Sequence, residues 1–265
     1  MIIEAGRPLR RGRAAQALFY LWGGFASLAA VAVFCALWQL AADMLGEFVL
    51  PGPLPVLRQT GAILQNIRAA DIPVTLYRAG LGISVAVAAG IMLGLLAGLS
   101  KTLGIFCRPL ISILLGMPPI IWVVLALFWF GMGSTGTVFT IVITVIPLTF
   151  AAAMRGMLTV DDGLKEMLEA YRVGWRGRIR HLYLPHLLNY LLPSVSVAAG
   201  MGVKIAIMAE LLGADDGIGA RIAAARAMLD TQEVLAYVVV VLMVIFAVEY
   251  LLIEPLRILL MPWEY

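Results

Sequence analysis

The chain has 265 residues, of which 62% are hydrophobic and 13% are charged, and its formal net charge is +3. A mean hydropathy of +0.98 excludes a water-soluble domain, because such a domain needs a polar surface, so the sequence indicates an all-α integral membrane protein. Two cysteines and two histidines without ligand spacing exclude a disulfide framework, and we expect no metal site.

A hydrocarbon core about 30 Å thick requires roughly 20 apolar residues in a helix. Runs of that length with few or no charges predict six spans in a single transmembrane domain, residues 1–265. In chain order the spans cover about 16–43, 76–100, 108–131, 135–156, 187–213 and 234–258. Because apolar runs recur as far as the C-terminus, the first run is interpreted as a span and not as a signal peptide.

Two segments between the spans have the composition of surface structure. Leu50–Asp71 opens with three prolines, which interrupt a helix, and then continues as a short amphipathic helix. Asp215–Val234 predicts a loop followed by a short helix on the same side of the membrane. Neither segment is long enough or apolar enough to be a span.

Glycine and proline mark two of the spans. Gly90, Gly94 and Gly98 recur at four-residue spacing, which predicts close helix packing in lipid. In the third span Pro118 and Pro119 predict a kink or break, because each proline removes a backbone hydrogen bond. Two interpretations of that break stay open: a simple structural kink, or a site that lines a translocation path.

Charged residues inside spans are costly in lipid, so they usually face a cavity or a partner. Lys204 and Glu210 are six residues apart, about 240° around a helix, so they do not face each other. We place both on the translocation path. Lys204 either attracts an anionic substrate or pairs with an acid elsewhere, and Glu210 is expected to hold the loop that follows. Arg78 and Glu249 lie near span ends and are expected to reach the membrane surface.

The distribution of Lys and Arg predicts the orientation, since short cytoplasmic loops retain basic residues. With the N-terminus inside, thirteen basic residues lie on the cytoplasmic side, including Arg7, Arg10, Arg11 and Arg257, and four lie on the other side. The sequence therefore predicts a multi-pass protein of a bacterial inner membrane with both termini cytoplasmic. The basic charge is spread over loops, so we expect no nucleic-acid partner.

A charged strip, "EMLEAYRVGWRGRIRHLYLP" from Glu166 to Pro185, lies in the predicted cytoplasmic loop 159–186. Its first part has the apolar spacing of an amphipathic helix, and Gly174 and Gly177 are expected to form a turn before a second helical piece. A helix, a turn and a helix with an apolar ridge suit docking into a groove on a partner. The alternative is a long basic loop with no partner.

This strip resembles the EAA loop of binding-protein-dependent ABC importer permeases. Glu166 matches its glutamate and Leu184 with Pro185 its terminal Leu-Pro pair, whereas Arg172 occupies the position of its glycine. The stretches "LPGPLPVL", "TLYRAGLG", "PPIIWVVLALFWFGMG" and "MAELLGADDGIGARI" look like the nitrate, sulfonate and taurine branch of these permeases. The resemblance implies that the following residues belong to a coupling loop that contacts an ATPase: Glu166, Glu169, Tyr171, Arg172, Gly174, Arg176, Leu184 and Pro185.

The resemblance implies a type I ABC importer permease fold with six transmembrane helices. It further implies two cytoplasmic ATPase subunits that bind ATP and Mg, a periplasmic or lipid-anchored substrate-binding protein, and a second permease copy, by default in a homodimer. The implied substrate is a small anion such as a sulfonate, taurine or nitrate, or a vitamin precursor. The fold, surrounded by membrane lipid, would itself carry no cofactor.

Motifs within the chain agree with a transport role that is not enzymatic. A phosphate-binding loop needs G-x-x-x-x-G-K-[ST], and the nearest stretch, "GLSKT", lacks the glycine before Lys101. No catalytic constellation of Ser, His and Asp is present in the sequence. The alternative is a stand-alone secondary carrier or channel that needs no ATPase.

Overall fold

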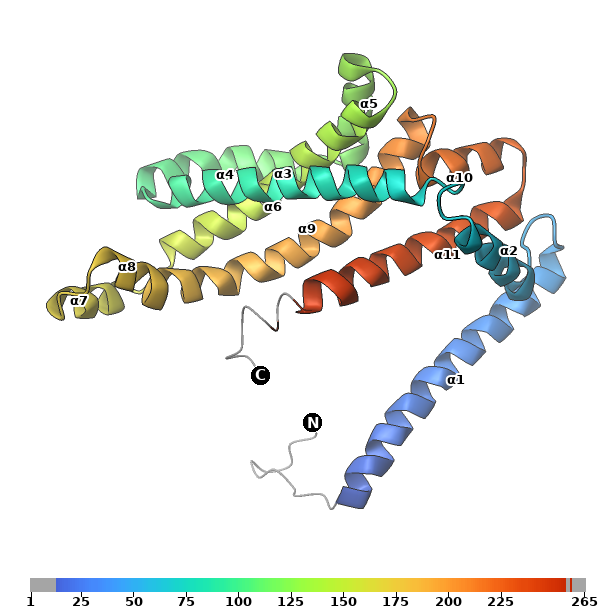
Figure 1. Cartoon of the computed structure of the whole chain (residues 1–265), viewed down its shortest axis with the longest axis horizontal. Helices are drawn as coiled ribbons and strands as arrows, with labels where there is room; N and C mark the ends of the chain where they lie inside the picture. Colours follow the sequence, from blue (N-terminus) through green and yellow to red (C-terminus); the bar gives the residue numbers. More distant parts are fainter. Residues whose placement is uncertain (1–12, 256–257, 259–265) are drawn as a thin grey trace. The chain divides into compact units, whose positions relative to one another are not determined.

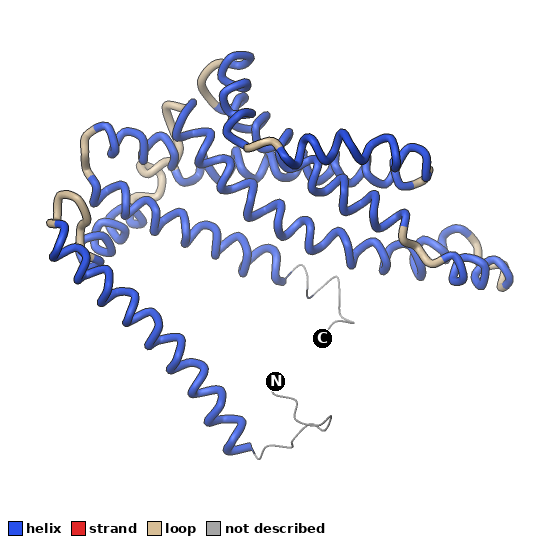
Figure 2. Tube along the Cα trace, turned by 180° about the vertical axis from the view of Figure 1, so that it is seen from behind, coloured by secondary structure: helices blue, strands red, loops and turns tan. Residues whose placement is uncertain are grey.

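The structure, a computed structural model, describes residues 13–255 and 258, and every regular element within them is helical (Figure 2). The elements are α1 (Arg13–Leu45), α2 (Pro53–Gln65), α3 (Ile72–Gly98), α4 (Lys101–Gly116), α5 (Pro119–Phe130), α6 (Ser134–Leu158), α7 (Asp162–Ala170), α8 (Trp175–Arg178), the π-helical turn η1 (Ile179–Tyr183), α9 (Leu184–Gly213), α10 (Ile218–Ala227), α11 (Thr231–Ala247) and the π-helical turn η2 (Val248–Ile253). The basic residues of the first twelve positions and Arg257 lie outside the described residues.

The chain forms two compact units, which divide after Arg58. In the first unit α1 is a helix of 33 residues that exposes large apolar side chains, including those of Leu28, Phe34 and Met44. After the helix the chain folds back on it, since Trp38 Nε1 donates a hydrogen bond to the carbonyl of Pro51 at 3.0 Å. A helix with apolar groups on all sides is covered by lipid or by another protein surface.

The core of the second unit is the packing of α3, α6 and α9, which run past one another in Figure 1. The residues at its centre are small or β-branched and fully buried: Ala79 and Ala86 from α3, Ile141 and Val145 from α6, and Ala198, Val203 and Ala206 from α9. Small side chains let helix backbones approach closely, which is how helices associate in lipid. These three helices therefore form the frame on which the other elements lie.

The row of glycines on α3 lies against α6. A Cβ at Gly90 would overlap Thr149, one at Gly94 would overlap the carbonyl of Phe150, and one at Gly98 would overlap Met157. Thr149 Oγ1 also donates to the carbonyl of Ala86 on α3 at 3.3 Å. The backbone of α3 therefore lies directly against α6 at these glycines, and a methyl group there would prevent the contact.

The third predicted span, 108–131, is not one straight helix. α4 and α5 form a bent pair with an angle of 89° between them. Pro118 adopts an extended conformation, φ −59° and ψ 134°, and Pro119 begins α5. The two prolines supply no backbone N–H, so the helix ends at Gly116 and restarts in a new direction. Counting the bent pair as one span gives six candidate spans, and not counting it gives five.

The last predicted span, 234–258, also has different limits in the structure. α11 begins at Thr231 because Asp230 caps it, its carboxylate accepting from the backbone N–H of Glu233 at 2.9 Å. The helix changes to a π-helical turn at Val248 and the described part of the span ends near Pro255. Residues 256 and 257 lie outside the described part.

Gly94→Ala should destabilise the helix frame, because the added methyl group has no space against α6. Overpacking of this kind costs about 1–3 kcal/mol. Gly80→Ala is the matched control on the same helix, since nothing lies within 4 Å of a Cβ at that position. Thermal unfolding of the detergent-purified variants measures the difference. Equal melting temperatures for both variants would contradict the close approach of α3 to α6.

Candidate coupling segment and translocation path

The segment that joins α6 to α9 forms two short helices at one end of the bundle (Figure 1). α7 begins at Asp162 because Asp161 caps it, with its carboxylate accepting from the N–H of Leu164 at 3.0 Å. No residue of α7 or α8 is buried. Leu164, Met167 and Trp175 nevertheless carry large apolar side chains that are about half exposed or more.

The turn between α7 and α8 uses Arg172 and not the two glycines expected there. Arg172 has φ +52°, the left-handed conformation, whereas Gly174 has φ −63° and ψ 161°. The N–H of Arg172 bonds the carbonyl of Glu169 at 2.9 Å and the N–H of Val173 bonds that of Leu168 at 2.9 Å. Left-handed backbone favours glycine, which is the residue that the EAA-type pattern has at the position of Arg172.

Arg178 closes the turn from the other side. Its Nη1 donates to Glu169 Oε1 at 2.7 Å and its Nε donates to the carbonyl of Val173 at 2.9 Å. α7 and α8 are therefore joined by side chain as well as by backbone. Sequence reasoning missed Arg178, because an arginine nine residues after a glutamate matches no helical spacing; the two residues meet only across the turn.

The remaining charged residues of the segment are available to a partner. Glu166, Arg172 and Arg176 are exposed, and none of them forms an ion pair with another described residue. Lys165 instead bonds Asp162 at 2.7 Å, and this hydrogen bond raises the pKa of the lysine ammonium. At the end of the segment Leu184 is half exposed and begins α9 with Pro185.

A hydrogen-bond cluster fixes the segment to the helix frame. Thr159 follows α6, and its hydroxyl forms a hydrogen bond with the phenol oxygen of Tyr190 on α9 at 3.0 Å. The same hydroxyl lies 3.2 Å from His186 Nε2 and donates to the carbonyl of Arg155 at 2.8 Å. A movement of the segment therefore acts on the end of α6 and the start of α9 together.

At the opposite end of the bundle, Arg78 lies at the centre of a buried polar cluster. Its side chain is 2% exposed and that of Glu210 is 0% exposed. Arg78 Nη1 donates to Glu210 Oε1 at 3.0 Å and to the carbonyl of Asp216 at 2.8 Å, and Nε donates to Ser134 Oγ at 2.9 Å. Nη2 forms an ion pair with the Asp216 carboxylate. The expectation that Arg78 reaches the membrane surface is wrong.

The carboxylate of Glu210 is satisfied on both oxygens. Besides Arg78, it accepts from Thr75 Oγ1 at 2.7 Å and from the backbone N–H of Gly219 at 3.2 Å. The expected hold on the following loop is thus confirmed, whereas zero exposure does not fit a residue that lines an open path. Breaking such a buried pair by removing one partner costs about 3–5 kcal/mol.

The loop after α9 is shaped to fit this carboxylate. Gly217 has φ +103°, and a Cβ there would fall on the Glu210 carboxylate. A Cβ at Gly219 would overlap the carbonyl of Ile207. Thr75 completes the arrangement by accepting from the N–H of Ile218 at 2.8 Å. The short sequence "ADDGIG" therefore supplies hydrogen-bond partners for Arg78 and Glu210, and its glycines leave room for the Glu210 side chain.

Lys204 has a different environment from the other charged residues within spans. Its side chain is exposed on α9, and no acidic side chain of the described residues lies within ion-pair distance of it. It lies nine residues before Gly213, the last residue of α9, which is about 13 Å along the helix. Val197, seven residues earlier, is exposed on the same face. Lys204 and Val197 therefore lie on one exposed face of α9.

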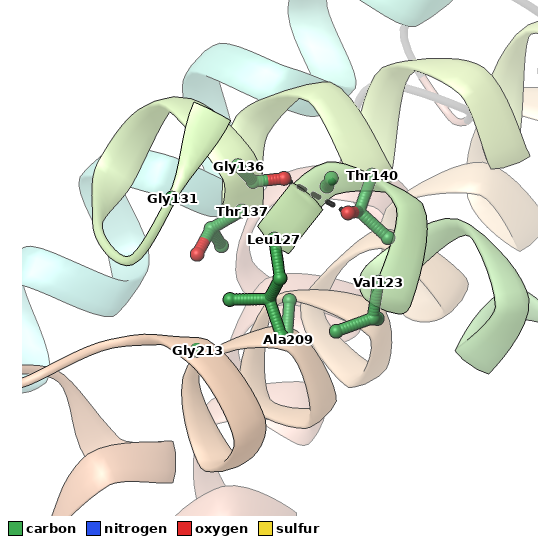
Figure 3. Close-up of a pocket in the computed structure, with 9 residues that line it drawn as sticks. Val123, Leu127, Gly131, Gly136, Thr137, Thr140, Ala209 and Gly213 are labelled. Carbon is green, nitrogen blue, oxygen red and sulfur yellow. Dashed lines mark hydrogen bonds between the residues drawn. The ribbon is translucent and has the colours of Figure 1, made fainter. Parts of the chain in front are cut away.

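The break at Pro118 and Pro119 positions α5 against α6 and α9. A cavity of about 10 Å³, shown in Figure 3, remains between these three helices, and Leu127 points from α5 toward Gly213. The hydroxyl of Thr140 there is bonded to the carbonyl of Gly136 at 2.8 Å (Figure 3). A space of this size holds about one water molecule, so it is a packing gap and not a passage.

Arg172→Gly should stabilise the turn of the coupling segment, because a left-handed residue with a Cβ is strained by about 1 kcal/mol relative to glycine. Limited proteolysis between α7 and α8 should become slower. Gly174→Ala is the control, since the backbone of Gly174 suits any residue and a Cβ there meets nothing within 4 Å. Faster cleavage of Arg172→Gly than of the unmodified chain would contradict the assignment of the turn.

Comparison with known proteins places the whole arrangement in a family. Residues 90–253 match the family described as binding-protein-dependent transport system inner membrane component. The nitrate import permease protein NrtB of Synechococcus elongatus is 28% identical, with 71% of each chain covered. The putative aliphatic sulfonates transport permease protein SsuC of Bacillus subtilis is 27% identical, over 83% of this chain and 80% of that one.

Two further similarities extend over most of the sequence. The taurine transport system permease protein TauC of Escherichia coli is 26% identical, over 90% of this chain and 89% of that one. Among solved structures, a chain of the MetNI methionine ABC transporter in an inward facing conformation has a TM-score of 0.50 at 16% identity. That alignment covers 77% of this chain and 92% of the other, and it supports the fold alone. The family match spans more than half of the sequence, so the chain belongs to the binding-protein-dependent inner membrane components and is an ABC importer permease of the nitrate, sulfonate and taurine branch.

Proposed function

We propose that this chain forms the path of an importer for a small anion and is driven by separate ATPase subunits that dock on residues 159–186. The observation that carries the proposal is the coupling segment, where large apolar side chains are exposed beside charged side chains that form no ion pair with another described residue. Family membership argues against a stand-alone carrier, since importers of this class work with an ATPase and a binding protein.

The proposed orientation places the coupling segment and both termini in the cytoplasm and α10 on the outer side. The excess of basic residues around the coupling segment supports it. In this orientation Leu164, Met167 and Trp175 form an apolar ridge that an ATPase groove would cover, with Glu166 and Arg176 at its edge. Closure of the ATPases would then move the ends of α6 and α9, which Thr159 holds together.

The proposed path runs along the face of α9 that carries Lys204. An ammonium group inside the membrane needs a counter-charge or water, and no described acidic side chain lies within ion-pair distance of it. A second copy of the chain would complete this face, which supports a homodimer as the transporting unit. Pro118 and Pro119 belong to the proposal as the break that turns α5 toward α9.

The proposed substrate class is a small anion. Three relatives are named for nitrate, aliphatic sulfonates and taurine, each of which carries an anionic group at neutral pH. A further relative at 24% identity is named for formylaminopyrimidine, so a vitamin precursor is the second candidate. Lys204 favours the anion, because a cation inside the path attracts negative charge and repels positive charge.

Glu166→Lys should weaken the complex with the ATPase, since it reverses a charge at the edge of the proposed docking ridge. We expect about tenfold less ATPase to remain bound during affinity purification of the permease. Glu47→Lys makes the same change at an exposed position outside residues 159–186 and serves as the control. Undiminished retention of the ATPase by Glu166→Lys, at equal permease yield, would contradict docking at this site.

Lys204→Met should lower the uptake of labelled taurine, nitrate or an alkanesulfonate into proteoliposomes that contain the full importer. A hydrogen bond to a charged group stabilises by about 1.5–3 kcal/mol, so the loss should be roughly tenfold or more. Lys204→Arg retains the charge and should keep most of the uptake. Val197→Met, on the same face of α9, controls for the change of shape. Unchanged uptake by Lys204→Met with normal assembly would remove Lys204 from the path.

A further inference from the structure

The Arg78 cluster joins four elements at one end of the bundle. Arg78 on α3 reaches Ser134 at the start of α6 and Glu210 near the end of α9, and it also reaches Asp216 in the next loop. Thr75, one turn before Arg78, donates to Glu210 and accepts from the first residue of α10. Within the described residues this is the one group of bonds in which side chains tie α3, α6, α9 and the α10 end together.

We infer that Arg78 is a positioning residue for transport: it holds these four ends as one block that stays closed throughout the cycle, so that the outer opening forms along another face. The inference rests on the proposed function, because it concerns a path that opens and closes. It adds to that function by identifying the helix ends on the outer side that stay together during transport.

The polar groups of the cluster make separation of the block unfavourable. Moving α3 away from α9 would leave the Glu210 carboxylate, which is 0% exposed, without its cation and without Thr75. A buried charge that loses its partner is destabilised far more than an exposed one. Gly217 and Gly219 add close backbone contacts that admit no methyl group. A sliding contact would not need such a fit.

The face of α9 that carries Lys204 lacks comparable bonds. Lys204 and Val197 are exposed there, and no described side chain bonds the ammonium group. Opening along this face would therefore break no ion pair within the chain. The difference between the two sides of α9 places the proposed movement on the Lys204 side and the fixed contact on the Arg78 side.

A second ion pair on the same block lies nearer the surface, where a cross-linking reagent can reach it. Arg221 on α10 bonds Asp71, the residue before α3, at 2.8 Å, and Arg221 is 47% exposed. A covalent bridge between these two positions would hold α3 to α10 without entering the cluster. If the block stays closed during transport, such a bridge does not interfere.

The experiment places Asp71→Cys and Arg221→Cys in a background without Cys35 and Cys107, both changed to Ser. A short reducible reagent that links two thiols forms the bridge, and proteoliposomes of the full importer are assayed for uptake of taurine, nitrate and an alkanesulfonate. We expect the bridge to change uptake by less than about twofold, below the usual effect of altering a coupling element. Loss of most of the uptake on bridging, with recovery on reduction, would overturn the inference.

A second arm asks whether holding the block is what Arg78 contributes. Arg78→Lys keeps a cation for Glu210 but lacks the five-donor fork that reaches Ser134, Glu210 and Asp216 together. We expect at least about threefold more ATP hydrolysed per substrate transported, at normal assembly, and recovery of the ratio when the bridge is formed. Arg226→Lys, an exposed position on α10, is the control.

Each result of the second arm is decisive. An unchanged ratio in Arg78→Lys, or a raised ratio that the bridge does not restore, would show that Arg78 does not act by holding the block. Asp216→Ala removes the exposed arm of the cluster while leaving the Arg78–Glu210 pair, and it provides the same comparison if Arg78→Lys fails to assemble. A failure of the proposed function is seen separately, as absence of uptake by the parent importer before any bridge is formed.

Discussion

Pairing of the charges inside the membrane is the constraint on which the rest of this structure depends. Arg78 and Glu210 lie in the hydrophobic part of the chain, where an unpaired charge is strongly disfavoured, and each is buried with a full set of partners. Their positions require α3 and α9 to be adjacent, and their remaining bonds place the start of α6 and the loop before α10. Arg78 and its partners thus connect four elements.

The same constraint separates the structural charges from the functional candidate. Arg78 and Glu210 compensate each other, so neither is free to attract a substrate. Lys204 lies on the same helix as Glu210 but faces away from the cluster, and the described residues supply no counter-charge for it. A charge without a partner in the described part of the chain is compensated from outside that part, by water, by another molecule or by an undescribed residue. This reasoning distinguishes residues that sequence hydropathy alone treats as equivalent.

The two ends of the frame have opposite characters. At the α10 end the bonds are buried, ionic and closely fitted around glycines. At the α7 end the coupling segment is held by exposed hydrogen bonds of Thr159 and by the Glu169–Arg178 pair, which solvent weakens.

The helical class and most of the spans could be predicted, because a run of about 20 apolar residues leaves few alternatives in lipid. The glycine row on α3 and the break at Pro118 and Pro119 could be predicted too, since both follow from the local chemistry of single residues. The size of that break, 89°, could not, because a proline pair permits many angles and only the packing of α5 on α6 and α9 selects one. The amphipathic pattern of α7 likewise predicted a surface helix, and none of the residues of α7 is buried.

Contacts between residues far apart in the chain were decided by the tertiary structure. The partner of Glu210 is 132 residues away, so no helical spacing could identify it, and Arg78 was expected at the membrane surface for that reason. The left-handed turn falls on Arg172 and not on Gly174, because the bonds of Arg178 to Glu169 and Val173 fix the path of the chain there. The sequence by itself determined which segments are helices and which can enter the membrane, since these depend on local composition. Which charges meet, and which one has no ion-pair partner among the described residues, depends on how the helices pack.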